Sequence, residues 1–409
     1  MTFNRVLEPK LRASLKAGRS VILFGPRQTG KTTLIKALCA EMPLCMEYPL
    51  QLPSVRAKIE ADPESLRREI EAACGRGRPV VFIDEIQKVP AVMDVLQYLL
   101  DEKKAVLIAT GSSARKMRQT QANWLPGRVM IERLHPLTWK ESGLIVAGDL
   151  NGTALKSRLL FGGLPGILSE KADLRVESLR SYSDLYLEEE IRREAVVRSL
   201  PPFAKFLRLA ALESGTSPNF SKMAGEVGVS HTSIRDYFQI LEDSLIIHRL
   251  EAFGKSRSNI VHKSKYYFFD LGVRNAASGV GHDPGLLVLQ MGLLFEHLII
   301  LEAVAASKDC RFSYWRNKKG EEVDLVVEKS AKRLAIEIKA TAKPRESDFS
   351  GLVSFRRDEK SDAAYLVCQV ERPQKFPHGT AVPWQMLGEI LSLSPTSRAA
   401  IPGPPRPGK

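Results

Sequence analysis

The chain has 409 residues, of which 44% are hydrophobic and 26% are charged, and its formal net charge at pH 7 is +13. These fractions are those of a soluble globular protein, and the length suggests two or three domains with full cores. The five cysteines are scattered and form no C-x-x-C pair, so neither a zinc site nor a disulfide framework is indicated.

The charge, the cysteines and the apolar stretches also bear on partners and location. The positive excess favours a polyanionic partner, although a solvated basic surface explains it equally well. An odd, unpatterned set of cysteines fits a reducing cytosol, so we expect a cytoplasmic protein. The most apolar long stretch, residues 286–306, is interrupted by Gln290, Glu296, His297 and Glu302. We therefore expect a buried or amphipathic helix there and no membrane partner.

A glycine-rich loop follows the first apolar run. Residues 21–24 predict a strand and residues 33–38 a helix, and the pattern G-x-x-x-x-G-K-T lies between them. In such a loop the backbone N–H groups and the helix N-terminus cradle phosphates. Lys31 would reach the β- and γ-phosphates, and the Thr32 hydroxyl would bind Mg²⁺. The expected nucleotide-binding residues are Gly25, Pro26, Arg27, Gln28, Thr29, Gly30, Lys31, Thr32 and Thr33.

Two carboxylates end the second apolar run. Residues 80–83 predict a strand buried on both faces, and Asp84 and Glu85 follow it directly. Ligands bind at the carboxyl ends of strands in open α/β sheets. We therefore expect Asp84 to hold the Mg²⁺ shell and Glu85 to act as the general base on the attacking water. The alternative, an ordinary strand end, is disfavoured by the glycine-rich loop upstream.

Two further candidates come from the next segments. A strand over residues 105–110 ends in polar residues, and the hydroxyl of Ser112 or Thr110 would touch the γ-phosphate or the attacking water. A serine-rich turn that caps the next helix is the alternative. Arg128 follows Pro126 and Gly127 and would stabilise the γ-phosphate of a neighbouring copy. A structural or substrate-contacting arginine is the alternative.

Several of these segments together resemble a known family. Residues 25–33, 80–90, 109–113, 125–129 and the Gly-Gly-Leu-Pro at 162–165 are similar to a prokaryotic family of AAA-type ATPases with a restriction-endonuclease-like C-terminal domain. The resemblance covers the chain to about residue 393. It implies Mg²⁺-dependent ATP hydrolysis and a ring-like or dimeric homo-oligomer.

The middle of the chain predicts a winged helix-turn-helix. Residues 178–199 form a charged helical stretch with a solvated face. Helices over 203–213 and 221–227, the latter capped by Ser221, precede a helix capped by Ser230. A hairpin over residues 245–269 would form the wing. The expected DNA contacts are Ser230, Thr232, Ser233, Arg235, Lys255 and Arg257. A connector or protein-docking module is the alternative.

The C-terminal region combines acidic residues on short strands. Asp324 lies on a strand over residues 322–328, and a strand over 334–340 alternates so that Glu337 and Lys339 share one face, about 6.6 Å apart. Two carboxylates would chelate Mg²⁺ or Mn²⁺ at a scissile phosphate, with Glu296 completing the shell and Lys339 assisting the water. This pattern resembles the restriction-endonuclease-like superfamily. Charged residues that keep the sheet soluble are the alternative.

These predictions combine into an α/β chain of four parts: an AAA-type P-loop ATPase core (1–165), a helical segment with a winged helix-turn-helix (166–265), a restriction-endonuclease-like domain (266–393) and a disordered tail (394–409). The first functional hypothesis is a Mg²⁺-dependent ATPase that remodels or processes DNA and carries a metal-dependent nuclease-like domain. The second is an ATP-dependent regulatory switch or scaffold whose C-terminal domain binds DNA or protein without catalysis.

Overall fold

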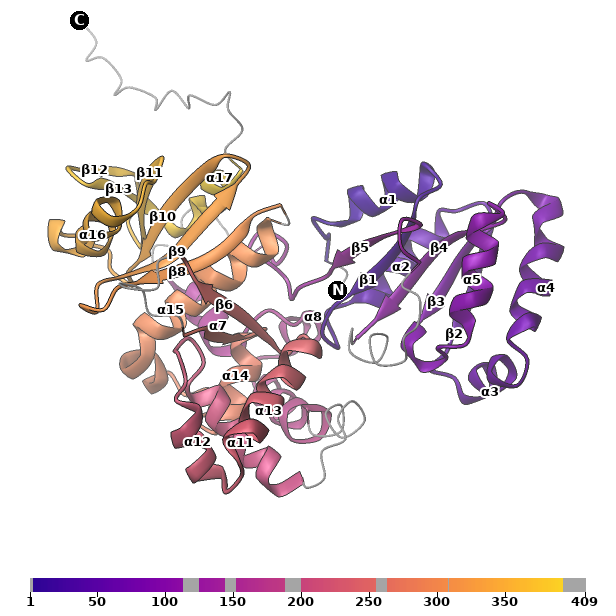
Figure 1. Ribbon diagram of the computed structural model, residues 1–409, viewed down its shortest axis with the longest axis horizontal. Coiled ribbons are helices and arrows are strands. Elements are labelled where there is room, and N and C mark those ends of the chain that lie inside the picture. The colour runs from indigo at the N-terminus through magenta and orange to yellow at the C-terminus, as the bar shows by residue number, and fades with distance from the viewer. Residues whose placement is uncertain are drawn as a thin grey trace, which may run out of the picture. The chain divides into compact units, whose positions relative to one another are not determined.

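The structure, a computed structural model, describes residues 3–112, 125–143, 152–187, 200–254, 263–307 and 309–392. It divides into two units, whose helices and strands are labelled in Figure 1. The first unit contains residues 1–249 and 264–290, and the second contains residues 250–263 and 291–409. The predicted ATPase core and most of the predicted winged helix-turn-helix therefore share one unit, and the predicted four-part division remains a prediction. The tail from residue 394 lies outside the described residues.

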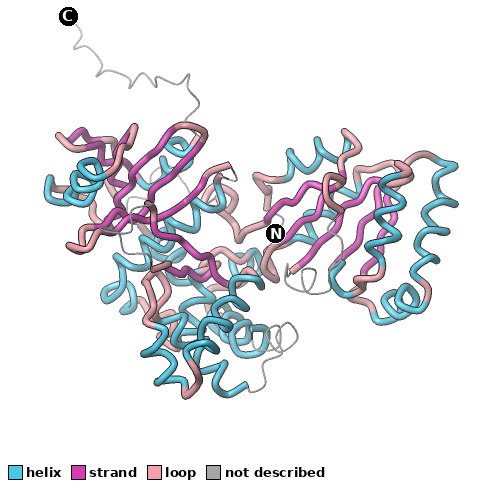
Figure 2. The backbone as a smooth tube through the Cα atoms, in the orientation of Figure 1, coloured by secondary structure: helices cyan, strands magenta, loops and turns pink. Residues whose placement is uncertain are grey.

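The first unit contains a parallel sheet of five strands in the order β2-β3-β4-β1-β5. Strands are drawn in magenta in Figure 2. Its strands are β1 (Ser20–Phe24), β2 (Cys45–Pro49), β3 (Val80–Asp84), β4 (Val106–Gly111) and β5 (Val129–Arg133). The predicted apolar runs form β1, β3 and β4, which are buried along their whole length. Because β4 lies between β1 and β3, the residues that follow β4 emerge between the glycine-rich loop and Asp84.

Helices cover both faces of this sheet. Val21 and Leu23 pack with Leu11 and Leu34 on one face, which carries α1 (Glu8–Lys16) and α2 (Lys31–Ala40). The alternate side chains of β1 face a second core together with α3 (Pro53–Ala61), α4 (Pro63–Ala73) and α5 (Val92–Asp101).

The segment between α2 and α4 forms β2 and α3, although its sequence is polar and has no regular pattern. Only Tyr48 is buried in β2 and only Ile59 in α3, so neither element shows a clear apolar period in the sequence.

The remainder of the first unit is mainly helical. Its elements are α7 (Thr153–Phe161), α8 (Pro165–Ser169), α9 (Arg175–Ser181), the π-helix η3 (Tyr182–Leu187), α11 (Leu200–Leu212), α12 (Phe220–Val227), α13 (His231–Asp243), β7 (Lys265–Phe268) and α14 (Leu271–Ser278). Strand β6 (Ile247–Ala252) begins in this unit, and its residues from Leu250 on belong to the second. Ile234, Phe238 and Leu241 of α13 are buried as expected. The cap of α12 differs from the prediction, because Asn219 accepts the first backbone N–H groups and Ser221 lies inside the helix.

The second unit is built on a mixed sheet. Strands β8 (Arg311–Arg316), β9 (Glu322–Lys329) and β10 (Lys332–Ile338) are antiparallel, and β10 continues in parallel to β11 (Ala363–Cys368) and β13 (Gly379–Pro383), with β12 (Gln374–Phe376) at the edge. Helix α16 (Ser350–Asp358) provides the crossover before β11, and η5 (Trp384–Met386) and α17 (Leu387–Leu391) close the described chain. β10 ends at Ile338, so Lys339 follows the strand in which it was expected.

Helix α15 (Gly285–Ala306) is the one helix in the described ranges that is long and apolar enough to cross a membrane. Half of its most apolar window is buried within the protein. The helix is also interrupted, since Gln290 has non-helical backbone angles. Leu294, Phe295 and Ile299 are buried after this break, as the prediction of a buried helix required.

Candidate active site

The glycine-rich loop connects β1 to α2 and needs both of its glycines. Gly30 has a φ of 89° directly before the helix, a left-handed conformation that other residues avoid. A Cβ on Gly25 would lie 2.3 Å from the carbonyl oxygen of Leu134. The loop is therefore held close to the chain that follows β5, with its helix starting at Lys31.

One hydrogen bond within the loop and two from neighbouring segments hold the loop in place. The Thr29 hydroxyl donates to the Pro26 carbonyl at 2.9 Å, which closes the loop on itself. The Arg5 guanidinium donates to the Thr29 carbonyl at 2.6 Å. The Tyr182 hydroxyl donates to the Arg27 carbonyl at 3.4 Å. The loop is thus fixed by the N-terminal segment and by η3 before any ligand binds.

Lys31 is buried within this loop. Its ammonium group donates to the carbonyls of Gly25 and Pro26, each at 2.8 Å, and the residue is 5% exposed. A buried ammonium requires acceptors on all sides, and phosphate oxygens are stronger acceptors than carbonyls. The position therefore suits a cation that exchanges carbonyl partners for phosphate oxygens. Thr33 follows in α2, and the side chain of Gln28 is exposed.

The Asp84 carboxylate accepts hydrogen bonds from three segments of the chain. The Thr32 hydroxyl lies 3.0 Å from its Oδ1, and the Thr110 hydroxyl donates to the same oxygen at 2.5 Å. The Gln51 amide donates to Oδ2 at 2.6 Å. The structure therefore brings Thr32 and Asp84 together as expected of a Mg²⁺ site, in which nucleotide phosphates and waters supply the remaining oxygens. Gln51 was missed because the strand before it, β2, was missed.

Glu85 is held in an unusual backbone conformation. Its φ is 60°, and its N–H donates to the Thr110 hydroxyl at 2.8 Å. A left-handed non-glycine residue persists only where its surroundings fix it. The Ser112 hydroxyl and the Gln87 amide both donate to Oε2 of Glu85, at 3.0 Å and 2.5 Å. The hydroxyls of Thr110 and Ser112, the two candidates at the end of β4, thus contact Asp84 and Glu85 at the end of β3.

Arg128 lies away from this group. It forms an ion pair with Asp101 at the end of α5, with the Nε and Oδ1 atoms 2.5 Å apart, and its side chain is 31% exposed. It directly precedes β5, and the amino ends of parallel strands lie opposite the edge where the loop and Asp84 are. The structure therefore does not bring Arg128 to the P-loop of its own chain.

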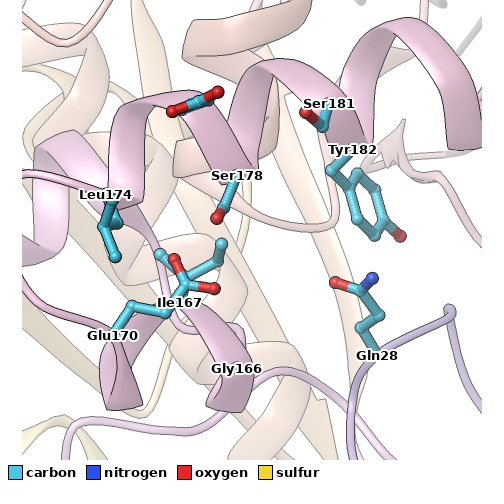
Figure 3. A pocket seen from close by; sticks show the side chains of 9 residues that line it. Gln28, Gly166, Ile167, Glu170, Leu174, Ser178, Ser181 and Tyr182 are labelled. Carbon is cyan, nitrogen blue, oxygen red and sulfur yellow. The ribbon is translucent and has the colours of Figure 1, made fainter.

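A cavity of about 460 Å³ lies beside the P-loop (Figure 3). Gln28 and Tyr182 line one side, and Glu170 and Ser178 line the other. Glu177 adds a second carboxylate to the lining. Because carboxylates repel phosphate, we assign the phosphate position to the loop itself and not to this cavity.

The predicted DNA-binding residues divide into two groups. Ser230, Thr232 and Arg235 are exposed at the start of α13. Ser230 also serves as the helix cap, since its hydroxyl accepts the Ser233 N–H at 3.0 Å. The backbone N–H of Ser233 is therefore used in capping α13, and Ser233 is half-buried. Lys255 and Arg257 lie outside the described residues.

The second unit brings its predicted acidic residues near Lys339. Glu337 is 6% exposed, and its Oε1 lies 2.9 Å from the Lys339 ammonium. The Asp324 carboxylate accepts the Ile338 N–H at 2.8 Å. Burial raises the pKa of Glu337 to about 7; Lys339 opposes this rise, and Glu296 and Glu322 add to it.

Glu337 retains one carboxylate oxygen, Oε2, that is buried without a hydrogen-bond partner in the described structure. Such an oxygen suits a cation as a ligand. Across the described ranges, however, no group of three or more His, Cys, Asp or Glu side chains is arranged to hold a metal ion. The predicted set of Glu296, Asp324 and Glu337 therefore remains a prediction.

Three family models match successive parts of the chain. Residues 17–143 match an AAA domain. Residues 152–283 match a domain of unknown function, DUF8612, and residues 291–387 match another, DUF4143. The boundary between the second and third matches coincides with the break in α15 and with the division into two units.

The chain is also similar to full-length proteins. An uncharacterized protein of Mycobacterium tuberculosis is 26% identical over 342 residues, which are 82% of this chain and 73% of that protein. The ATPase family gene 2 protein of Schizosaccharomyces pombe is 26% identical over 202 residues, 44% of this chain and 23% of that protein. The structure of a Walker-type ATPase of Pyrococcus abyssi has a TM-score of 0.49 at 16% identity and covers 68% of this chain and 96% of its own. Residues 17–143 are thus similar to an AAA domain, and they contain the glycine-rich loop and the carboxylates described above.

Proposed function

We propose that the chain is a Mg²⁺-dependent ATP hydrolase that uses ATP turnover to remodel or process DNA. The observation that carries the proposal is the hydrogen-bonded group at the carboxyl ends of β1, β3 and β4. There Thr32, Asp84 and Glu85 converge with the hydroxyls of β4 beside a loop shaped for phosphates. This convergence supplies every group that phosphoryl transfer to water requires from a single chain.

Each residue has a defined task in this proposal. The loop N–H groups and Lys31 bind the β- and γ-phosphates, and Thr32 with Asp84 holds the Mg²⁺. The metal ion neutralises charge that develops on the phosphate oxygens. Glu85 accepts a proton from the attacking water, which its carboxylate can reach only if its orientation is fixed. Arg128 would complete the site of a second copy, and this role requires a homo-oligomer.

The second unit supports a DNA-processing role. Its order of elements is α15, β8, β9, β10, α16 and β11, with Asp324 and Glu337 on neighbouring strands. We propose that this is a restriction-endonuclease-like fold in which the two carboxylates bind Mg²⁺ or Mn²⁺ beside a DNA phosphate. The unpartnered Oε2 of Glu337 favours a cation there. The exposed start of α13 would contact duplex DNA through Thr232 and Arg235.

One observation favours a second candidate function. Lys339 already pairs with Glu337, and this ion pair partly neutralises the carboxylate that a metal would need. In a regulatory switch, ATP binding would alter assembly, and the second unit would bind DNA or protein without cutting it. Both candidates require ATP binding, and they differ in whether Glu337 and Lys339 act on a phosphodiester.

Steady-state ATPase assays on the full-length protein test the first proposal. Lys31→Ala should reduce turnover by about a hundredfold or more, because it removes the cation that contacts the reacting phosphates. Lys36→Ala is the matched control, since Lys36 is exposed on the same helix. Equal turnover in wild type and Lys31→Ala would reject the ATPase assignment.

Nuclease assays on linear, single-stranded and branched DNA separate the two candidates. The nuclease hypothesis expects cleavage with Mg²⁺ or Mn²⁺ in the presence of ATP, and loss of cleavage in Glu337→Gln but not in the surface variant Glu389→Gln. If the wild type cuts none of these substrates, the regulatory function is the better description.

A further inference from the structure

Gln87 lies against the proposed general base and has no role in the mechanism above. It belongs to the 3₁₀ turn η2 (Ile86–Lys88), which follows Glu85 directly. Its side chain is 6% exposed. The amide nitrogen donates to Oε2 of Glu85 at 2.5 Å and to the Ser112 hydroxyl at 3.0 Å. Gln87 therefore links the end of β3 to the end of β4.

The hydrogen bonds on the Glu85 carboxylate are one-sided. Gln87 and Ser112 both donate to Oε2, and neither donates to Oε1. A carboxylate bound twice through one oxygen has a fixed rotamer, and its second oxygen has a fixed direction. A general base needs this fixation, because proton transfer requires hydrogen-bond distance to the water.

The surroundings are shaped to accept an amide at this position. A Cβ on Gly111 would lie 3.3 Å from the Gln87 carbonyl oxygen and 2.7 Å from the Phe24 ring, so glycine leaves the room that the amide occupies. The Gln87 carbonyl oxygen is buried without a hydrogen-bond partner in the described structure. A buried unpartnered carbonyl destabilises the folded state, and an apolar side chain of equal length would avoid this cost. The amide is thus retained for its donors at a cost to stability.

We propose that Gln87 is a positioning residue for ATP hydrolysis. Together with Ser112 it holds Oε2 of Glu85, so that Oε1 is directed at the attacking water. Gln87 acts through Glu85 and contacts neither the nucleotide nor the metal ion. This inference rests on the proposed ATPase function, in which Glu85 is the general base.

The test measures kcat and KM for MgATP in the full-length protein. Gln87→Met keeps the length of the side chain and removes both donors. We expect kcat to fall about 10- to 100-fold, with KM within about twofold of wild type, because the base is misoriented while the phosphate cradle is unchanged. Gln239→Met, at an exposed glutamine on α13, should leave both parameters unchanged.

A double variant distinguishes positioning from general damage to the site. In a Glu85→Gln background there is no base to position, so adding Gln87→Met should lower the residual rate by less than about twofold. The proposal is overturned if Gln87→Met alone leaves kcat unchanged, if it raises KM as much as it lowers kcat, or if its effect persists in the Glu85→Gln background. If wild type and Glu85→Gln turn over ATP equally, the proposed function itself fails instead, and this inference fails with it.

Discussion

Replacing Glu337 with glutamine should stabilise the second unit at alkaline pH and not at acidic pH. Burial raises the pKa of this carboxyl from an ordinary value of 4.5 to about 7. The folded state therefore holds the proton more tightly than the unfolded chain does. Its contribution to stability is full below about pH 4.5 and is lost as the pH rises through about 7. Glutamine is neutral throughout and avoids this loss.

The size of the effect follows from the same shift. A rise from 4.5 to about 7 corresponds to about 3 kcal/mol of stability lost above pH 7. The pKa of about 7 already includes the attraction of Lys339 and the repulsion of Glu296 and Glu322. We therefore expect a gain of about 3 kcal/mol at most at pH 8.

Hydrogen exchange of backbone amides provides the assay, because it reports the opening free energy of one unit in a chain with several. Protection of β9 and β10 should rise in Glu337→Gln at pH 8 and equal that of wild type at pH 4, after correction for intrinsic exchange. Glu389→Gln, exposed on α17, is the control at both pH values. The reasoning is refuted if Glu337→Gln is less protected than wild type at pH 8, or equally stabilised at both values.

Three further variants test other parts of the structure. In thermal melts, Gly162→Ala should destabilise the first unit by about 2–4 kcal/mol, because Gly162 has a φ of 70° and an added Cβ would lie 2.0 Å from the Asp270 carboxylate. The control Gly225→Ala, which has open space around it, should be neutral or stabilising in the same measurement. Arg5→Met should weaken nucleotide binding in titrations by removing a hydrogen bond to the P-loop carbonyl, and unchanged affinity would contradict this role. Ser230→Ala should cost about 1 kcal/mol in chemical denaturation through loss of the α13 cap, and a cost near zero would show that the cap is dispensable.

The strongest sequence signals were the continuous apolar runs and the glycine-rich loop. Strands β1, β3 and β4 are continuous apolar runs, and the glycine pattern between β1 and α2 has a single physical explanation. For these elements the sequence predicted the location of Lys31, Asp84 and Glu85 at one edge of a sheet. The cap of α13 was equally clear, since the Ser230 hydroxyl satisfies a backbone N–H at the start of the helix.

Other parts depend on three-dimensional neighbours that a single sequence does not contain. Gln51 reaches Asp84 only because β2 is the edge strand next to β3. Gln87 carries no chemical signal by residue type, and its contact with Glu85 appears only once the left-handed turn is known. Arg128 could be assigned to an edge of the sheet only once the residues after it were known to form β5, parallel to β1.

The chain path between the two units has a practical consequence for truncation. Residues 250–263 belong to the second unit, whereas the chain directly before and after them belongs to the first. The chain enters the second unit again after Gln290. Glu251 and Ala252 pair with β8, so a fragment beginning at Met291 would expose the backbone of β8 as an open edge. Open edges recruit strands from other molecules, and such a fragment would self-associate for a reason unrelated to its native assembly. Point substitutions in the intact chain avoid this artefact, whereas deletion of either half does not.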